Sequence, residues 1–298
     1  MMDGILVIDK PAGKTSHDIV NVVRKRTGIR KVGHTGTLDP MATGVLVMLI
    51  GKATRIARFL ELEPKEYVAQ ALFGTVTDSQ DITGNIVRES HESVDIEKLI
   101  KLIPQFTGSI VQIPPMVSAI KVGGTPLYKL ARQGKEVERT GREITIYELE
   151  MLDHFERDSR TYASFRVVCS GGTYVRTLLH DIGEALGVGA TLSSLRRTRV
   201  GRYSLVETLE LDDIDGDMII SHVLGMDDAL SHLAAVVVKN DIIQAVLNGR
   251  TVDSSDLEPG QQTPGGGDFV RLKSPDNRLL AIGVMQSTGA IKPEIVFS

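Results

Sequence analysis

Two long strand-like stretches, residues 143–155 and 162–169, lie in the middle of this 298-residue sequence. Both contain the β-branched and aromatic side chains that favour strands. The short polar segment between them gives the pair the spacing of an antiparallel hairpin. Other strand-like and helix-like stretches are mixed without the regular spacing of βαβ units. The sequence therefore predicts an α+β fold with a mixed, largely antiparallel sheet core rather than a doubly wound parallel sheet.

The N-terminal segment reads as a strand followed by a helix. The strand is predicted at residues 4–9, and Ser16 is in position to N-cap the helix, which ends near Gly28. The apolar stripe of this helix consists of Ile19, Val20, Val22 and Val23. Further strands are predicted at residues 45–50, 67–76, 117–121 and 190–205, and further helices at 96–103, 127–133 and from Gly172 to about 186.

The last quarter of the chain differs in character. An acidic stretch at residues 207–217 reads as a connection, and beyond about residue 236 come a short helix (241–247), a Gly/Pro-rich loop (258–268) and three short strands. This pattern predicts a small β-barrel-like domain. We therefore expect two domains, residues 1–232 and 233–298.

The net charge of −4 is unevenly distributed. Residues 1–60 contain 10 Lys and Arg against 4 Asp and Glu, whereas the other 238 residues contain 24 against 34. A basic segment fits a nucleic-acid partner, but a solvated basic surface that binds nothing explains it equally well. Charge alone does not decide between them.

Composition favours the cytoplasm. The start of the chain does not resemble a signal peptide, and the longest apolar run, residues 45–50, is too short to span a bilayer. The single cysteine, Cys169, lies in a strand-like setting and is expected to be a buried, inert thiol. We expect no membrane partner.

One segment, residues 32–44 (VGHTGTLDPMATG), has neither helical nor strand periodicity. It holds three Gly, three Thr and one Pro, so it is either an ordered loop or a disordered one. Elsewhere, Gly13-Lys14-Thr15 lacks the first glycine of a phosphate-binding loop, and the seven His residues have no zinc-site spacing. No cofactor or metal is expected.

The loop at residues 33–44 closely resembles the signature loop of the TruB/dyskerin family of pseudouridine synthases. The resemblance extends over roughly residues 3–205 and includes these segments: GILVIDKPAGKTS, KEYVAQALFGTVTDSQDITG, PPMVSAIKVGG, CSGGTYVRTLLHDIG and LRRTRVG. It implies the pseudouridine synthase fold and the isomerisation of uridine 55 in the T-loop of tRNA, without a cofactor.

The same resemblance implies three catalytic residues. Asp39 matches the family's catalytic aspartate, which acts as a nucleophile or forms an adduct that assists glycosidic cleavage. Arg176 matches the arginine that pairs with this aspartate, since a desolvated carboxylate needs a nearby cation to stay ionised. Tyr67 matches the tyrosine that stacks on the target uracil and takes part in proton transfer. By themselves, the same residues would read as a turn aspartate, an exposed helix arginine and a core tyrosine.

Five further residues are expected to bind the RNA or shape the site. His34 resembles the residue that fills the place of the flipped-out base. Lys10, with Pro11, resembles the support of the catalytic loop, or else contacts backbone phosphate. Asp81 resembles a position that contacts the RNA or orders its turn, in which Gln80 departs from the common pattern. Tyr174 and Leu195 are expected to form the pocket, although both fit a core equally well.

Residues 236–298 resemble, only weakly, the PUA-like domain that helps bacterial members of the family to hold tRNA. The expected partner is the T-arm stem-loop of tRNA, bound by a monomer with no obligatory protein partner. The alternative is a tRNA-binding or tRNA-folding protein that no longer catalyses. The combination of Asp39, Tyr67 and Arg176 argues against it, because a carboxylate facing an anionic ligand does not help a pure binder.

Overall fold

A ten-stranded sheet forms the centre of the fold in the computed structural model, which describes residues 2–118, 120–131, 133–135, 137–211, 215–261 and 263–297. Its strands are β1 (Gly4–Lys10), β2 (Val32–His34), β3 (Thr43–Ile50), β4 (Lys65–Phe73), β7 (Gly108–Gln112), β10 (Arg142–Arg157), β11 (Arg160–Cys169), β12 (Ala190–Val200), β13 (Tyr203–Ser204) and β14 (Leu209–Glu210). They run in the order β14-β1-β3-β12-β4-β11-β10-β7, with β2 beside β3 and β13 beside β12. Only the β1–β14 and β3–β12 pairs are parallel. The predicted α+β class with a largely antiparallel sheet is confirmed.

The predicted central hairpin is β10–β11, and it is longer than expected. Asp158 and Ser159 form its turn, both with positive φ (50° and 59°), as in the tight turns whose twist suits a hairpin. Along β11 every second residue from Ala163 to Cys169 is fully buried. Cys169 lies in this row, which confirms the expectation that its thiol is buried, and burial raises the pKa of the thiol to about 11.

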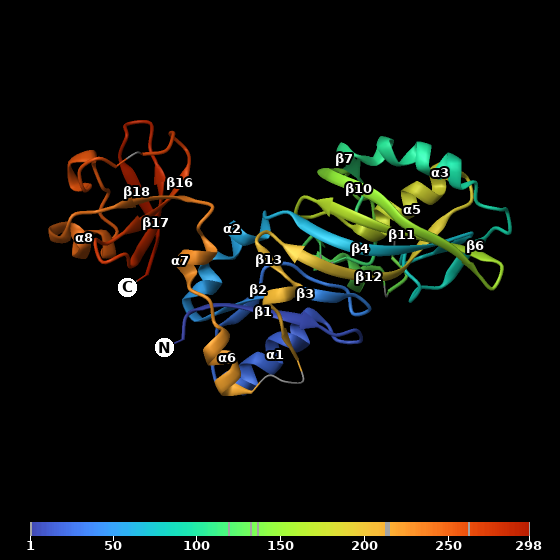
Figure 1. The fold of residues 1–298 in the computed structure, drawn as a ribbon, viewed down its shortest axis with the longest axis horizontal. Helices are drawn as coiled ribbons and strands as arrows, with labels where there is room; N and C mark the ends of the chain where they lie inside the picture. The colour runs from blue at the N-terminus through green and yellow to red at the C-terminus, as the bar shows by residue number, and fades with distance from the viewer. Residues whose placement is uncertain are drawn as a thin grey trace.

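Helices cover the two ends of the sheet (Figure 1). Helix α1 (Ser16–Thr27) packs Ile19, Val20 and Val23 against one face of β1 and β3. Helices α3 (Ile96–Leu102) and α5 (Val175–Leu186) pack on the part formed by β4, β11 and β12. Residues 35–42, which form the loop that contains Asp39, thus run between β2 and β3, while α5 brings its first turn to the neighbouring part of the sheet.

The start of α1 differs from the prediction by one residue. Thr15 rather than Ser16 is the N-cap: its side chain accepts a hydrogen bond from Asp18 N (3.1 Å), and its own N–H donates to Asp18 Oδ2 (2.8 Å). This reciprocal capping box gives a hydrogen-bond acceptor to two backbone N–H groups, those of Thr15 and Asp18. Ser16 is left free for another contact, described below. The helix ends at Gly28, with φ of 70°, as predicted.

Two other predicted boundaries were wrong. Instead of a strand at 117–121, the residues up to Ser118 form a bend, residue 119 lies outside the described residues, and β8 (Lys121–Val122) pairs with β9 (Thr125–Pro126). The predicted helix after it is shorter, α4 (Leu127–Ala131). The helix predicted at 96–103 is α3, which ends at Leu102, and Pro104 lies at the start of the 3₁₀ turn that follows, η2 (Ile103–Phe106), where a proline is tolerated because no backbone N–H is needed.

The C-terminal region forms its own sheet, set apart at one end of the molecule (Figure 1). It has four strands rather than three, in the order β15 (Ala234–Val237), β16 (Phe269–Lys273), β17 (Leu279–Met285) and β18 (Ile291–Val296). Helix α8 (Ile243–Leu247) packs on it. Within the described residues the sheet is open and does not close into a barrel.

The C-terminal sheet shares a hydrophobic cluster with the central one. Ile282, Ile295 and Phe297 pack with residues of β3 and of α2 (Ala57–Glu61). At the same junction Arg58 lies over the rings of Phe59 (4.8 Å) and Phe269 (4.9 Å).

The remaining described elements are β5 (Thr75–Thr77), β6 (Ile86–Glu89), η1 (Gly51–Ile56), η3 (Leu205–Glu207), α6 (Gly216–His222), α7 (Met226–Ala229), η4 (Asn240–Ile242) and η5 (Ser254–Asp256). Across the described ranges, no helix is long and apolar enough to cross a bilayer.

Candidate active site

The segment that lacked periodicity is an ordered loop. Its first residues are tied to the sheet by Thr35 N, which donates to Val47 O (3.1 Å), and its middle to α1 by Leu38 N, which donates to Ser16 Oγ (2.9 Å). Gly44 closes the loop with φ of 103°, and a Cβ there would lie 2.1 Å from Arg197 O. Only glycine fits this contact between the loop and β12. These restraints fix the backbone on both sides of Asp39.

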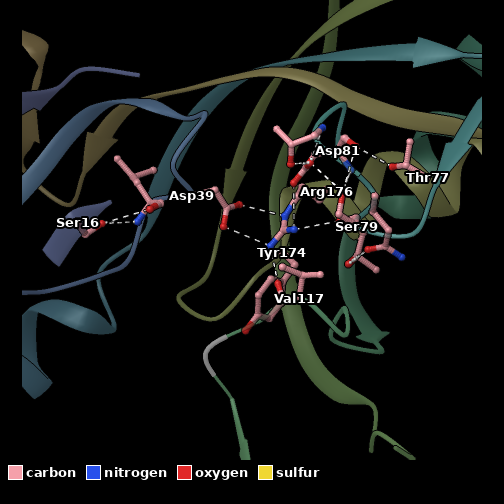
Figure 2. Close-up of polar contacts among 12 residues, drawn as sticks. Ser16, Asp39, Thr77, Ser79, Asp81, Val117, Tyr174 and Arg176 are labelled. Carbon is pink, nitrogen blue, oxygen red and sulfur yellow. Dashed lines mark hydrogen bonds and ion pairs between the residues drawn. The ribbon is translucent and has the colours of Figure 1, made fainter. Parts of the chain in front are cut away.

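Asp39 and Arg176 form a two-point ion pair across the site (Figure 2). Arg176 Nε lies 3.0 Å from Asp39 Oδ2, and Arg176 Nη2 donates to Asp39 Oδ1 at 3.3 Å. The two residues are 137 positions apart in the chain. Arg176 is almost fully buried in the first turn of α5, whereas the Asp39 side chain is 32% exposed. The carboxylate therefore keeps one side open for a ligand.

The other side of the Arg176 guanidinium is held by the turn after β5 (Figure 2). Nη1 donates to Asp81 Oδ2 (3.2 Å) and to Ser79 O (3.0 Å), and Nη2 also donates to Val117 O (2.9 Å). Asp81 is buried, and its Oδ1 accepts hydrogen bonds from Ser79 Oγ and Thr83 N (both 2.9 Å). Asp81 was expected either to contact the RNA or to order its turn, and these contacts order the turn.

The electrostatics of Asp39 reflect a competition. Burial raises the pKa of its carboxyl group, the charge of Arg176 lowers it, the Asp81 carboxylate raises it, and Lys10 lowers it again. The net shift is upward. Two-point contact with an arginine thus offsets part of the desolvation that the recessed position imposes.

A cavity of about 260 Å³ opens beside the ion pair. Tyr67, Tyr174 and Leu195 all line it, together with Asp39 and Arg176. Tyr67 is buried on β4, and burial raises the pKa of its phenol, so the group is neutral at neutral pH. The backbone of Tyr174 is held on both sides by the Gln112 amide, at 2.8 and 3.1 Å. Five of the eight predicted site residues therefore surround one cavity.

The other two predicted residues near the loop, Lys10 and His34, lie outside the lining of this cavity. Lys10 is fully buried, and its Nζ donates to the carbonyl oxygens of Lys14 (2.6 Å), Pro11 (2.9 Å) and Pro40 (3.3 Å). These contacts support the loop that contains Asp39, which is the first of the two roles expected for Lys10; the second was contact with backbone phosphate. His34 ends β2, and its Nδ1 accepts a hydrogen bond from Gly36 N (3.3 Å). Burial, followed by the charge of Arg197, lowers the pKa of its imidazole.

Two cationic residues of the cavity were missed in the sequence. Lys65 on β4 and Arg197 on β12 both line the cavity and are almost fully buried. A signal was present: Tyr67 and Leu195 were expected in the pocket, and side chains two positions apart in a strand share a face. That rule points from Tyr67 to Lys65 and from Leu195 to Arg197.

Comparison with known proteins agrees with this geometry. The profile of the TruB family pseudouridylate synthase N-terminal domain matches residues 24–175, and that of the tRNA pseudouridylate synthase B C-terminal domain matches residues 176–235. Among curated relatives, the tRNA pseudouridine synthase B of Alkaliphilus oremlandii is 44% identical over 86% of this chain and 85% of its own. That of Geobacillus thermodenitrificans is 40% identical over 99% of this chain and 100% of its own.

Solved structures show the same fold. The structure titled "Crystal Structure of a Cbf5-Nop10-Gar1 Complex" superposes with a TM-score of 0.74 at 31% identity, covering 99% of this chain and 85% of the other. Sequence profiles covering most of the chain, closely related curated enzymes and a shared fold all agree. The protein is therefore a pseudouridylate synthase, and hence an isomerase, that belongs to the TruB family.

Proposed function

We propose that the protein converts uridine 55 in the T-loop of tRNA to pseudouridine, with Asp39 as its catalytic carboxylate. The observation that carries the proposal is the Asp39–Arg176 pair at the edge of the cavity, in which a partly exposed carboxylate is held by a buried guanidinium. tRNA as the substrate class rests on the relatives, which are tRNA pseudouridine synthases. Uridine 55 and the role of Asp39 rest on the loop sequence.

The reaction breaks the C1′–N1 bond, turns the base and joins C1′ to C5. Asp39 acts on the reacting nucleoside, and Arg176 keeps the Asp39 carboxylate ionised and oriented. Tyr67 lines the cavity with a neutral phenol, which suits stacking on uracil and proton donation. Tyr174 and Leu195 also line the cavity and provide surfaces against which a flat base can lie.

The target base has to leave its stack in the RNA before it can enter the cavity beside Asp39. His34 is proposed to fill the vacated place. Its lowered pKa keeps the imidazole neutral at neutral pH, which suits stacking between bases better than pairing with phosphate. Lys10 and Asp81 support the reaction indirectly, through the loop of Asp39 and the turn behind Arg176.

We assign catalysis to residues 1–232 and propose that residues 233–298, which contain the separate four-stranded sheet, act as a PUA-like domain that holds the tRNA. The enzyme is proposed to work in the cytoplasm as a monomer, without a cofactor or an obligatory protein partner. Light scattering of the purified protein, with and without tRNA, tests the monomer.

Tritium release from a T-arm stem-loop labelled at C5 of uridine tests the proposed reaction. The wild-type protein is expected to release tritium without added cofactor, since C5 loses its hydrogen when it bonds to C1′. The Asp39→Asn variant is expected to release none while binding the RNA with similar affinity, because only the chemical step needs the carboxylate.

Asp153→Asn is the matched control, since it makes the same change at an exposed position of β10. It is expected to retain wild-type release. Tritium release by Asp39→Asn at the wild-type rate would refute the role of Asp39. Binding without release by the wild type would refute this reaction on this RNA and favour a tRNA-binding role.

A further inference from the structure

Arg197 is a buried cation without an anionic partner in the described residues. It is 1% exposed, and it contacts uncharged oxygens: Nε donates to Val45 O (2.7 Å), Nη2 donates to Gly36 O (3.1 Å), and a side-chain hydrogen bond joins it to the Tyr67 phenol. No carboxylate of the described chain lies within ion-pair distance. Arg176, the other buried arginine of the cavity, has two such carboxylates.

Lys65 repeats this situation on the neighbouring strand. It is 5% exposed, and its Nζ donates to Glu61 O (2.7 Å) and Glu63 O (2.9 Å), with no carboxylate in ion-pair distance among the residues described. Both cations flank the loop of Asp39: a Cβ on Gly36 would lie 3.4 Å from Lys65 Cε and 3.5 Å from Arg197 Nη1. Together they form a cationic wall of the cavity, Lys65 and Arg197.

A pair of buried positive charges that lacks a carboxylate at ion-pair distance is costly to maintain, and the more distant charges of Glu61 and Glu63 offset this cost only in part for Lys65. Burial, and after it the charge of Arg197, lower the pKa of Lys65 to about 8. Asp39 does not neutralise this wall, because both of its oxygens face Arg176. Such a wall becomes favourable once a negative charge occupies the cavity.

The proposed reaction itself generates a negative charge there. When the C1′–N1 bond breaks, both of its electrons stay on N1, and uracil departs as a monoanion whose charge spreads over N1, O2 and O4. After the base has turned, C5 bonds to C1′, the proton on C5 is lost, and one proton is gained at N1, so atoms and charge balance. We propose that Arg197 and Lys65 stabilise this detached uracil anion, and so assist glycosidic cleavage.

This inference rests on the proposed function, and a backbone phosphate is the competing source of negative charge. The two are separable. A phosphate contact acts on binding, so its loss weakens affinity and reduces the salt dependence of binding. Stabilisation of a charge that exists only during reaction acts on the rate of the bound complex and leaves affinity nearly unchanged.

The test compares single-turnover consumption of the target nucleoside in two T-arm stem-loops that carry uridine or 5-fluorouridine. The fluorinated base has no C5 proton to lose and cannot become pseudouridine, so its C1′–N1 cleavage is scored as loss of 5-fluorouridine. Fluorine stabilises the departing anion, so the fluorinated base needs the cationic wall less. Arg197→Gln is expected to slow conversion of uridine by roughly 10²–10³-fold, the loss typical of removing one preorganised donor at a developing charge. The defect with 5-fluorouridine is expected to be at least tenfold smaller. Nucleoside analysis of digested RNA measures both.

Arg199→Gln is the matched control, because it makes the same change two positions along β12 at a side chain that is 49% exposed. Arg197→Lys retains the charge and is expected to recover much of the rate, and thermal unfolding checks that each variant is folded. A merely structural role would slow both RNAs equally. Equal defects, or a defect confined to affinity and its salt dependence, would overturn the inference. Failure of the wild type on both RNAs would instead refute the proposed function.

Discussion

The guanidinium of Arg176 connects two carboxylates that come from different parts of the chain. It holds Asp39 of the loop between β2 and β3 on one side and Asp81 of the turn after β5 on the other, and it also donates to two carbonyl oxygens. Lysine has the same charge but lacks the planar fork that makes these contacts together. The position of the Asp39 carboxylate therefore depends on arginine and not on charge alone.

Arg176→Lys is expected to lower the single-turnover rate by roughly 10²-fold, because a misplaced reactive group costs about that much. The lost hydrogen bonds at the buried Asp81 side are expected to reduce the free energy of unfolding by about 1–3 kcal/mol. Urea unfolding and rapid quench measure the two effects. Arg166→Lys, on β11 and paired with Glu66 and Glu148, is the control. A wild-type rate in Arg176→Lys would contradict the claim that the planar guanidinium is needed to position the Asp39 carboxylate.

The pH dependence of the rate is expected to report Asp39. Protonation removes the reactive carboxylate, so the rate falls as the pH falls through the pKa of Asp39, which burial raises above its usual range. The Asp81 carboxylate also raises this pKa. Asp81→Asn is therefore expected to move the acid limb of the rate profile to lower pH. An acid limb that moved to higher pH would contradict this expectation. It would show that Asp81 acts on Asp39 mainly by holding Arg176 in place and not by its own negative charge.

At this scale the resemblance of the loop and helix segments to the TruB/dyskerin family predicted residues that, taken alone, would read as a turn aspartate and an exposed arginine, and the buried cations of the cavity were missed. Asp39 and Arg176 were expected to pair, and they do. Lys65 and Arg197 were overlooked because lysine and arginine usually lie on surfaces, and nothing in a single sequence states that a cation is buried without a carboxylate.

Between elements, two adjacent hydroxyl residues at the start of helix α1 have separate roles, and only one of them contacts the loop that contains Asp39. Thr15 caps the helix through Asp18, whereas Ser16 accepts a hydrogen bond from Leu38 N, next to Asp39. The sequence prediction assigned the cap to Ser16, because both residues are good caps and only the position of Asp18 distinguishes them.

This division predicts different outcomes for two similar substitutions. Ser16→Ala leaves the buried Leu38 N–H without its partner and is expected to cost about 1–3 kcal/mol in unfolding free energy, with a rate roughly tenfold lower because the loop beside Asp39 loosens. Thr15→Ala is expected to cost about 1 kcal/mol with no change in rate. Chemical unfolding and single-turnover assays distinguish them. Equal rates in the two variants would mean that the Ser16 contact does not position Asp39.

In the whole molecule, the C-terminal sheet is anchored by a junction around Arg58. Its guanidinium lies over the rings of both Phe59 and Phe269, which meet edge to face with their centroids 4.9 Å apart, and it pairs with Glu294 of β18. Residues of this sheet also belong to a cluster shared with β3. The sequence predicted a separate strand-rich unit but neither its open four-stranded order nor this joint core, since both depend on contacts between distant segments.

Loosening this junction is expected to affect long RNAs more than short ones. Arg58→Ala removes two cation–π contacts at a half-exposed position, which is expected to cost roughly 0.5–1 kcal/mol in stability. Hydrogen exchange of β18 is expected to quicken. The KM for full-length tRNA is expected to rise several-fold, while that for the T-arm stem-loop stays the same. Equal KM changes for both RNAs would contradict a role of the C-terminal sheet in holding tRNA.

The central proposal, conversion of uridine 55 by Asp39, is tested most directly by mapping pseudouridine at nucleotide resolution in a full-length tRNA transcript. After incubation with the wild-type protein, chemical labelling and primer extension are expected to show one new pseudouridine, at position 55, and none with Asp39→Asn. A pseudouridine at another position alone, or the same product from the Asp39→Asn variant, would contradict it.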